Sequence, residues 1–171
     1  RILEASRKVS SDAQRVLALA VRTLKSPHES AVESKMTFIG FAGLIDPPRE
    51  EVRDSIALCH KAGIQVVMIT GDHPLTAFAI ARNLGIAKSE QQVITGKELD
   101  EMDEETLAQH VQSYCVYARV TPEHKVRIVN AFKKHQLVVA MSGDGVNDAP
   151  SLKNADIGIA MGKSGTDVCK Q

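Results

Sequence analysis

Three short segments of the chain hold residue types that can bind a phosphoryl group and a metal ion. Residues 143–148, "GDGVND", contain two carboxylates, an amide and two glycines. Residues 70–72, "TGD", add a hydroxyl and a carboxylate, and Arg119 and Lys125 supply positive charge. Glycines expose backbone amides that suit phosphate, and closely spaced carboxylates suit a hard cation such as Mg²⁺. The three segments together predict a Mg²⁺-dependent phosphoryl site.

Each segment also has a purely structural interpretation. "TGD" is a common sequence where a strand passes into a turn, and Asp144 and Asp148 could simply form turns. Lys125 could be an exposed charge on a helix. The density of polar and glycine residues in 143–148, directly after an apolar run, favours the functional interpretation for that segment.

Apolar runs and periodic segments indicate the elements that position these residues. We predict strands at 15–22, 36–45, 65–70, 92–95, 114–119, 137–142 and 156–161. We predict helices at 2–13, 49–62, 74–84, 98–112 and 121–135. Strands that alternate with helices predict an α/β fold, a Rossmann-like open parallel sheet with right-handed crossovers. Ligands bind such sheets beyond the carboxyl ends of the strands, which selects the loops after Thr70, Arg119 and Ser142.

Two features refine this expected fold. Residues 65–70 and 137–142 are continuous apolar runs of the kind buried on both faces of a parallel sheet. Residues 46–49, "DPPR", hold two consecutive prolines, which cannot continue a central strand. We therefore expect a boundary there, with residues 1–45 forming one part of the chain and residues 46–171 the other.

Composition excludes several classes of protein. The 171 residues are 43% hydrophobic and 25% charged, which is typical of globular proteins. Twenty-one basic residues balance 21 acidic ones, so no net charge attracts nucleic acid or an anionic membrane. No apolar run approaches the roughly 20 residues that span a bilayer. The chain begins with arginine and has no signal-peptide pattern, so we expect it to come from the interior of a longer protein.

Four motifs resemble, in order, those of the P-type cation-transporting ATPases, which lie within the haloacid dehalogenase-like superfamily. They are "DPPR", "MITGDH", "ARVTPEHKVRIV" and "MSGDGVNDAPSLKNADIGIAMGKSGTDV". The match covers nearly the whole chain from Met36 onward. The earlier segment "RVLALAVRTL" resembles the end of the family's nucleotide-binding domain. "DPPREEV" and "GTDVCKQ" are most similar to type II pumps, Ca²⁺ pumps in particular.

The resemblance implies roles for the residues around the predicted metal. Asp144 is implied as the Mg²⁺ ligand. Asn147 and Asp148 are implied to order the phosphoryl group and the surroundings of the metal. Asp148 would either bind the metal itself or contact a residue or water that binds it. Lys125 is implied to contact the γ-phosphate of ATP and to neutralise charge during transfer. Arg119 is implied to reach the nucleotide.

The remaining roles concern the phosphate loop and the hinge. Thr70 and Gly71 are implied to hold the phosphoryl oxygens, with Asp72 supporting their loop. Asp46 and Arg49 are implied at the hinge between the nucleotide-binding and phosphorylation domains. Phosphoryl transfer needs mainly positioning and charge neutralisation, and these residue types can supply both.

The function that the resemblance implies is that of an ATP-driven cation pump with Mg²⁺ as its cofactor. Such a pump transfers the γ-phosphate of ATP to an aspartate and hydrolyses it to drive ion transport. Its chain would lie at the cytoplasmic face of a membrane, with actuator, nucleotide-binding and transmembrane domains as partners. Ca²⁺ is the implied ion, and H⁺, Na⁺/K⁺ and Mg²⁺ are the alternatives.

The sequence lacks several motifs that the family carries. It contains no "DKTGT" motif, which carries the phosphorylated aspartate, and no "KGA" or "TGE" motif. We therefore expect an incomplete phosphorylation domain that forms no phosphoenzyme by itself. In this superfamily the missing strand lies between the strands that lead into "TGD" and "GDGVND". Its loss would leave unpaired strand edges, which the chain could cover within its own sheet or by self-association.

Two other functions remain open. A free-standing phosphatase of the same superfamily would need its own aspartate nucleophile in a DxDx-type motif near the N-terminus, where Asp12 is a lone aspartate without a following strand-to-loop context. A non-catalytic domain that binds Mg²⁺ or a nucleotide is the second alternative.

Overall fold

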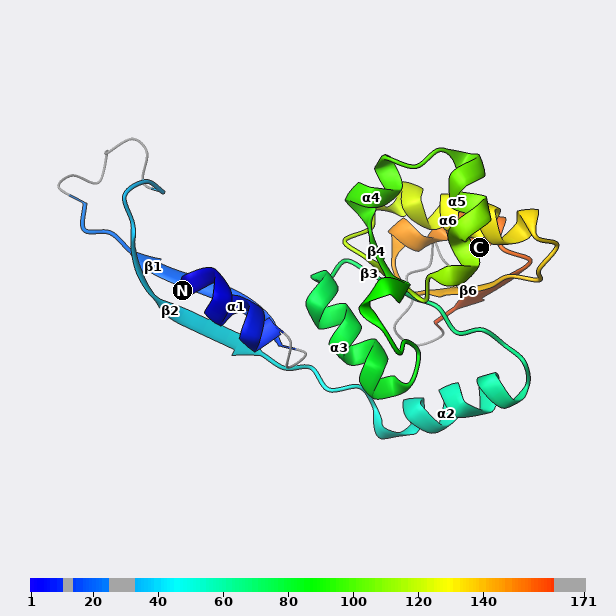
Figure 1. The fold of residues 1–171 in the computed structure, drawn as a ribbon, viewed down its shortest axis with the longest axis horizontal. Helices are drawn as coiled ribbons and strands as arrows, with labels where there is room; N and C mark the ends of the chain where they lie inside the picture. The colour runs from blue at the N-terminus through cyan, green and yellow to red at the C-terminus, as the bar shows by residue number, and fades with distance from the viewer. Residues whose placement is uncertain (11–13, 25–32, 162–171) are drawn as a thin grey trace.

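The computed structural model describes residues 1–10, 14–24 and 33–161, and a helix with a hairpin stands beside an α/β body (Figure 1). The helix is α1 (Ile2–Ser10), and strands β1 (Arg15–Val21) and β2 (Thr37–Leu44) pair antiparallel. Most hairpin side chains are exposed. The hairpin base approaches the body, because Thr76 Oγ1 donates to Gln14 O at 3.2 Å.

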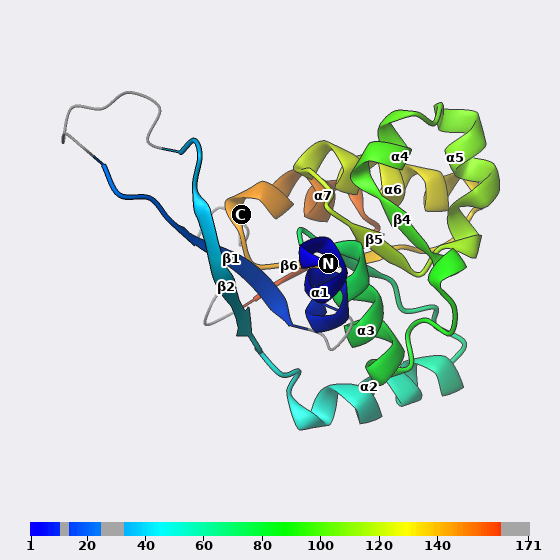
Figure 2. The same cartoon turned by 60° about the vertical axis from the view of Figure 1, so that its left-hand side comes forward.

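The body alternates helices and strands, as the sequence predicts (Figure 2). Its helices are α2 (Glu50–Lys61), α3 (Pro74–Leu84), α4 (Gly96–Asp100), α5 (Glu104–His110), α6 (Pro122–Lys134) and α7 (Ala149–Asn154). Its strands are β3 (Met68–Thr70), β4 (Val93–Thr95), β5 (Val116–Ala118), β6 (Ala140–Gly143) and β7 (Ile157–Ala160). Short 3-10 turns are η1 (Glu90–Gln92), η2 (Val111–Ser113) and η3 (Val146–Asp148). None of the helices in these described ranges is long and apolar enough to cross a membrane.

Capping residues explain where the helices begin and end. Helix α3 starts at Pro74, and its last residue precedes Gly85, whose φ of 80° is the left-handed conformation that glycine adopts readily. The prediction of a single helix at 98–112 is wrong. Thr95 caps α4, and Asp103 then accepts a hydrogen bond from the Thr106 backbone, so a second helix, α5, begins after a break.

The body strands are all parallel but form two separate sheets. Strands β3, β5 and β4 form one sheet in that order, and β6 pairs with β7 in the other. No ladder joins the two sheets within the described part of the chain. The α/β class with parallel strands is confirmed, and the two sheets are consistent with an open Rossmann-like sheet.

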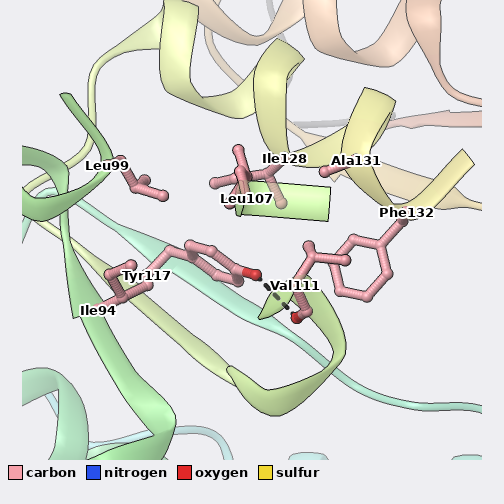
Figure 3. Packing of buried hydrophobic residues seen from close by; sticks show 8 residues of the cluster. All are labelled: Ile94, Leu99, Leu107, Val111, Tyr117, Ile128, Ala131 and Phe132. Carbon is pink, nitrogen blue, oxygen red and sulfur yellow. Dashed lines mark hydrogen bonds between the residues drawn. The ribbon is translucent and has the colours of Figure 1, made fainter. Parts of the chain in front are cut away.

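The core lies on both faces of β5, which is fully buried. Residues from α5, α6 and η2 pack on one face, and α3 packs on the other. Tyr117 is central to the first cluster, where its hydroxyl donates to Val111 O at 3.1 Å (Figure 3). Desolvation by burial raises the pKa of Tyr117, so its phenol stays protonated. This core includes Ile128, Ala131 and Phe132 of α6, the helix that carries Lys125.

Two predictions about the apolar runs are wrong. Strand β3 covers only the last three residues of 65–70 and is half-buried, and β6 begins at Ala140, while Val138 is 78% exposed. Both runs border a cavity of about 870 Å³ between the two sheets. Neither run is fully buried, because no described strand pairs with them across this cavity.

Candidate active site

The site centres on an ion pair between Lys125 and Asp148. Lys125 lies in the first turn of α6, and its Nζ donates to Oδ1 of Asp148 at the end of η3. Asp148 is buried, with 7% of its surface exposed. Its other oxygen, Oδ2, accepts from the backbone N–H of Gly145 at 3.2 Å. The carboxylate is thus held from two sides.

These contacts keep Asp148 ionised. Burial by itself raises the pKa of a carboxyl group, because it removes water from the charged form. The hydrogen bonds from Lys125 and from the Gly145 backbone act in the opposite direction, and the net pKa of Asp148 lies below its ordinary value. The carboxylate therefore stays charged and keeps Lys125 at the site.

Gly143 allows the 143–148 loop to fold tightly. A Cβ at this position would lie 2.5 Å from the Cβ of Asp148 and 2.8 Å from its Cγ. Real Cβ atoms do not approach so closely, so only glycine fits without a shift of the loop. The spacing of glycine and aspartate in "GDGVND" is therefore a packing requirement as well as a chemical pattern.

The loop after β3 is stabilised by its own side chains. Thr70 Oγ1 accepts from the backbone N–H of Asp72 and donates to Asp72 Oδ2, both at 3.1 Å. A Cβ added to Gly71 would meet no atom within 4 Å. The space that a side chain at Gly71 would occupy is therefore empty.

Arg15 also belongs to this site, and the sequence did not reveal it. Its Nη2 donates to Asp72 Oδ1 at 2.7 Å, which joins the hairpin to the "TGD" loop. This hydrogen bond lowers the pKa of Asp72, and the charge of Arg119 lowers it further. No local pattern separates Arg15 from an ordinary surface arginine, because its partner lies 57 positions away.

The structure brings part of the predicted set to one cavity. Lys125, Asp144 and Asp148 line the cavity between the sheets together with Ile69, which precedes Thr70. Arg119 follows β5 in the left-handed conformation, with φ 56°. Thr70, Gly71, Asp72 and Arg119 do not line this cavity, so the structure brings together only the residues of the loop after β6 and Lys125 of α6.

The remaining predicted residues lie on the surface. Asn147 is exposed on η3, and Asp46 and Arg49 are exposed between the hairpin and α2. The hydrogen bond to Asp72 and the charge of that residue raise the pKa of Arg15, and the charge of Asp46 adds to the effect. Arg49 occupies the position before α2, where its side chain makes no capping hydrogen bond.

The side chains at the end of β6 fit a hydrated magnesium ion. Asp144 is exposed at the cavity, whereas both oxygens of Asp148 already accept hydrogen bonds. Over the described ranges, no three or more histidine, cysteine, aspartate or glutamate residues gather closely enough to bind a metal. Mg²⁺ keeps several waters and often needs only one or two carboxylates from the protein. Asp144 is therefore the residue best placed to bind it.

The chain belongs to the haloacid dehalogenase-like hydrolase family, whose model matches residues 4–156. It is 53% identical to calcium-transporting ATPase 1 of Bacillus cereus over 99% of this chain and 19% of that protein. It is 48% identical to the calcium-transporting ATPase of Bacillus subtilis over 96% of this chain and 19% of the relative. It is 45% identical to human calcium-transporting ATPase type 2C member 1 over 96% of this chain and 17% of that protein.

These relatives confirm the resemblance inferred from the four motifs. The chain spans only about a fifth of the length of the curated relatives it matches. The family and the names of its relatives agree with the phosphoryl chemistry expected of the three loops.

Proposed function

We propose that this chain is part of an ATP-driven Ca²⁺ pump, in which it supplies the Mg²⁺-binding and phosphate-binding loops for formation and hydrolysis of an aspartyl phosphate. The observation that carries the proposal is the Lys125–Asp148 ion pair beside the exposed Asp144, at a cavity between two parallel sheets. A lysine, a structural carboxylate and a second, accessible carboxylate at the ends of strands suit phosphoryl transfer. The identity of the ion rests on the names of the relatives.

Each residue of the metal and phosphate loops has a role that its surroundings support. Asp144 binds Mg²⁺, which when present neutralises charge on the phosphoryl oxygens. Lys125 is held within reach of the same cavity by Asp148 and contacts the γ-phosphate. Asn147 is exposed beside them and orders the phosphoryl oxygens. The backbone at Gly71, in the loop that the Thr70 hydroxyl stabilises, supplies amides for the same oxygens.

The nucleotide side of the proposed site involves the hairpin. We assign residues 1–45 to the end of a nucleotide-binding domain and residues 46–171 to a phosphorylation domain. Arg119 faces the nucleotide, and Asp46 and Arg49 form the hinge. The contact between Arg15 and Asp72 supports this assignment, because it links the first part to a phosphate loop of the second.

The phosphorylated aspartate would come from elsewhere in the pump. The cavity of about 870 Å³ between β3 and β6 has the position expected for the strand that carries it. We therefore propose that the isolated chain is inactive and that its unpaired strand edges favour self-association. In the pump, that strand, the actuator domain, the rest of the nucleotide-binding domain and the transmembrane helices are its partners, at the cytoplasmic face of the membrane.

Calcium uptake tests this function. The pump that contains this chain would be reconstituted into vesicles, and ATP-dependent uptake of Ca²⁺ would be measured for the wild type, Asp144→Asn and Lys153→Ala. Lys153 is an exposed residue of α7 and serves as the control. The proposal predicts uptake that Asp144→Asn abolishes and Lys153→Ala leaves unchanged. Hydrolysis of simple phosphomonoesters by the isolated chain, without any uptake by the pump, would instead indicate a phosphatase.

A further inference from the structure

His124 is a buried polar residue directly before Lys125, and both of its ring nitrogens have partners. It is 5% exposed. Its Nδ1 accepts from the backbone N–H of Thr121, at the start of α6, at 3.0 Å. Its Nε2 lies 2.7 Å from Oδ1 of Asp100, the last residue of α4. One imidazole ring thus connects the start of α6 to a neighbouring helix.

The partners of His124 define its tautomer. A nitrogen that accepts from a backbone N–H cannot carry a proton of its own, so Nδ1 is unprotonated. The neutral ring then carries its proton on Nε2 and donates it to Asp100. This hydrogen bond has an ionised acceptor and is stronger than one between neutral groups. The orientation of the ring is therefore fixed.

The same ring supports the loop between β5 and α6. Arg119 in that loop has φ 56°, a conformation that costs a non-glycine residue energy unless its surroundings hold it. Its carbonyl oxygen lies against Gly96, the first residue of α4, where a Cβ would be 2.3 Å away. That Cβ would also lie 3.1 Å from Cε1 of His124. Helix α4 thus contacts the loop at Arg119 and holds the His124 ring through Asp100.

We propose that His124 and Asp100 are positioning residues that set the place of Lys125 and of the Arg119 backbone at the phosphate site. The proposal rests on the function proposed above, because Lys125 must act on a phosphoryl group for its position to matter. His124 touches neither substrate nor metal and acts through its neighbour in α6. A histidine that merely fills the core would contribute stability without affecting Lys125.

Three variants separate positioning from stability. His124→Leu removes both hydrogen bonds, and Asp100→Ala removes the acceptor for Nε2. His124→Gln keeps an acceptor for the Thr121 N–H and a donor for Asp100, since glutamine is a natural partner at this third helical position. The rate of phosphoenzyme formation from ATP would be measured at saturating ATP in the pump that contains this chain, together with the unfolding midpoint of each variant.

Positioning predicts that His124→Leu slows phosphorylation about tenfold or more, because small displacements of a catalytic group are costly. Asp100→Ala should slow it less, and His124→Gln should restore the wild-type rate. Equal rates in the wild type and in folded His124→Leu would overturn the proposal. So would a glutamine variant as slow as the leucine variant.

A second measurement on the chain itself separates the two proposals. The Gly145 amide donates to Asp148, so its NMR signal reports where the Lys125–Asp148 pair lies. We expect this signal to move in His124→Leu and to keep its place in His124→Gln. A pump that forms no phosphoenzyme would refute the proposed function, while the NMR result would still decide whether His124 positions Lys125. An unmoved Gly145 signal in folded His124→Leu would refute the positioning.

Discussion

Lys125 and Asp148 lie 23 positions apart and form a partly buried ion pair that joins α6 to the loop after β6. Asp148 also accepts from the Gly145 backbone, so the pair belongs to a small network of hydrogen bonds. Within this network, the lysine holds the loop in shape and remains at the cavity where we place the phosphoryl group. Stability and function are therefore coupled at Lys125.

Replacing Lys125 by alanine should destabilise the chain. Asp148 would lose its charged partner while remaining buried, which costs about 1–3 kcal/mol. Urea unfolding of the isolated chain measures the loss, with Lys153→Ala as the control for removal of an exposed lysine. If the two variants unfolded at the same urea concentration, the ion pair would contribute nothing to stability.

The depressed pKa of Asp148 predicts how this contribution depends on pH. A carboxyl group with a lower pKa in the folded state contributes stability above its unfolded pKa, about 3.9, and loses it as pH falls through the folded pKa. The stability difference between the wild type and Asp148→Asn should be full at pH 7 and should shrink below about pH 4. Unfolding free energies at several pH values test this. A difference independent of pH would show that the Asp148 charge is not stabilised by folding.

Gly143 offers a steric test of the same loop. Gly143→Ala would place a Cβ 2.5 Å from the Cβ of Asp148, and the forced shift should cost about 1–3 kcal/mol. Gly40 in β2 is a matched control, because a Cβ there meets nothing within 4 Å. Thermal unfolding of both alanine variants compares them. A Gly143 variant as stable as the Gly40 variant would mean that the loop is not tightly packed.

The contact between Arg15 and Asp72 makes a different prediction, because Arg15 is largely exposed. Arg15→Ala should change stability little, since exposed ion pairs contribute little. It should nevertheless raise the pKa of Asp72, because the hydrogen bond from Arg15 lowers this pKa more than any other contact does. NMR titration of the Asp72 carboxyl group measures this, with the exposed Arg7 mutated to alanine as the control. An unchanged Asp72 pKa in Arg15→Ala would show that the two residues do not pair in solution.

The sequence predicts well those elements whose ends are marked by local chemistry. Pro74 and Gly85 bracket α3, and Thr121 with Pro122 marks the start of α6. The motif loops follow strands that apolar runs locate, so the sequence predicts that these loops lie at the strand ends, and the structure brings Lys125, Asp144 and Asp148 to one cavity. Helix α7 was not predicted, because its six residues are too few to show helical periodicity.

What could not be predicted depends on contacts between distant parts of the chain. The pairing of Arg15 with Asp72 and of His124 with Asp100 has no local signal in the sequence. The exposure of Val138 also has no local cause, since an apolar run looks the same whether or not a neighbouring strand covers it. These features depend on contacts between elements far apart in the sequence, which only the structure reveals.

Labelling with ATP tests the central claim most directly. The pump that contains this chain, and this chain alone, would each be incubated with γ-labelled ATP, Mg²⁺ and Ca²⁺, and acid-stable label would be mapped to peptides. We predict Ca²⁺-dependent label in the pump, on a peptide outside these 171 residues, with Asp144→Asn abolishing it and the isolated chain unlabelled. Acid-stable label on a residue of this chain, or a pump that forms no phosphoenzyme, would contradict the account.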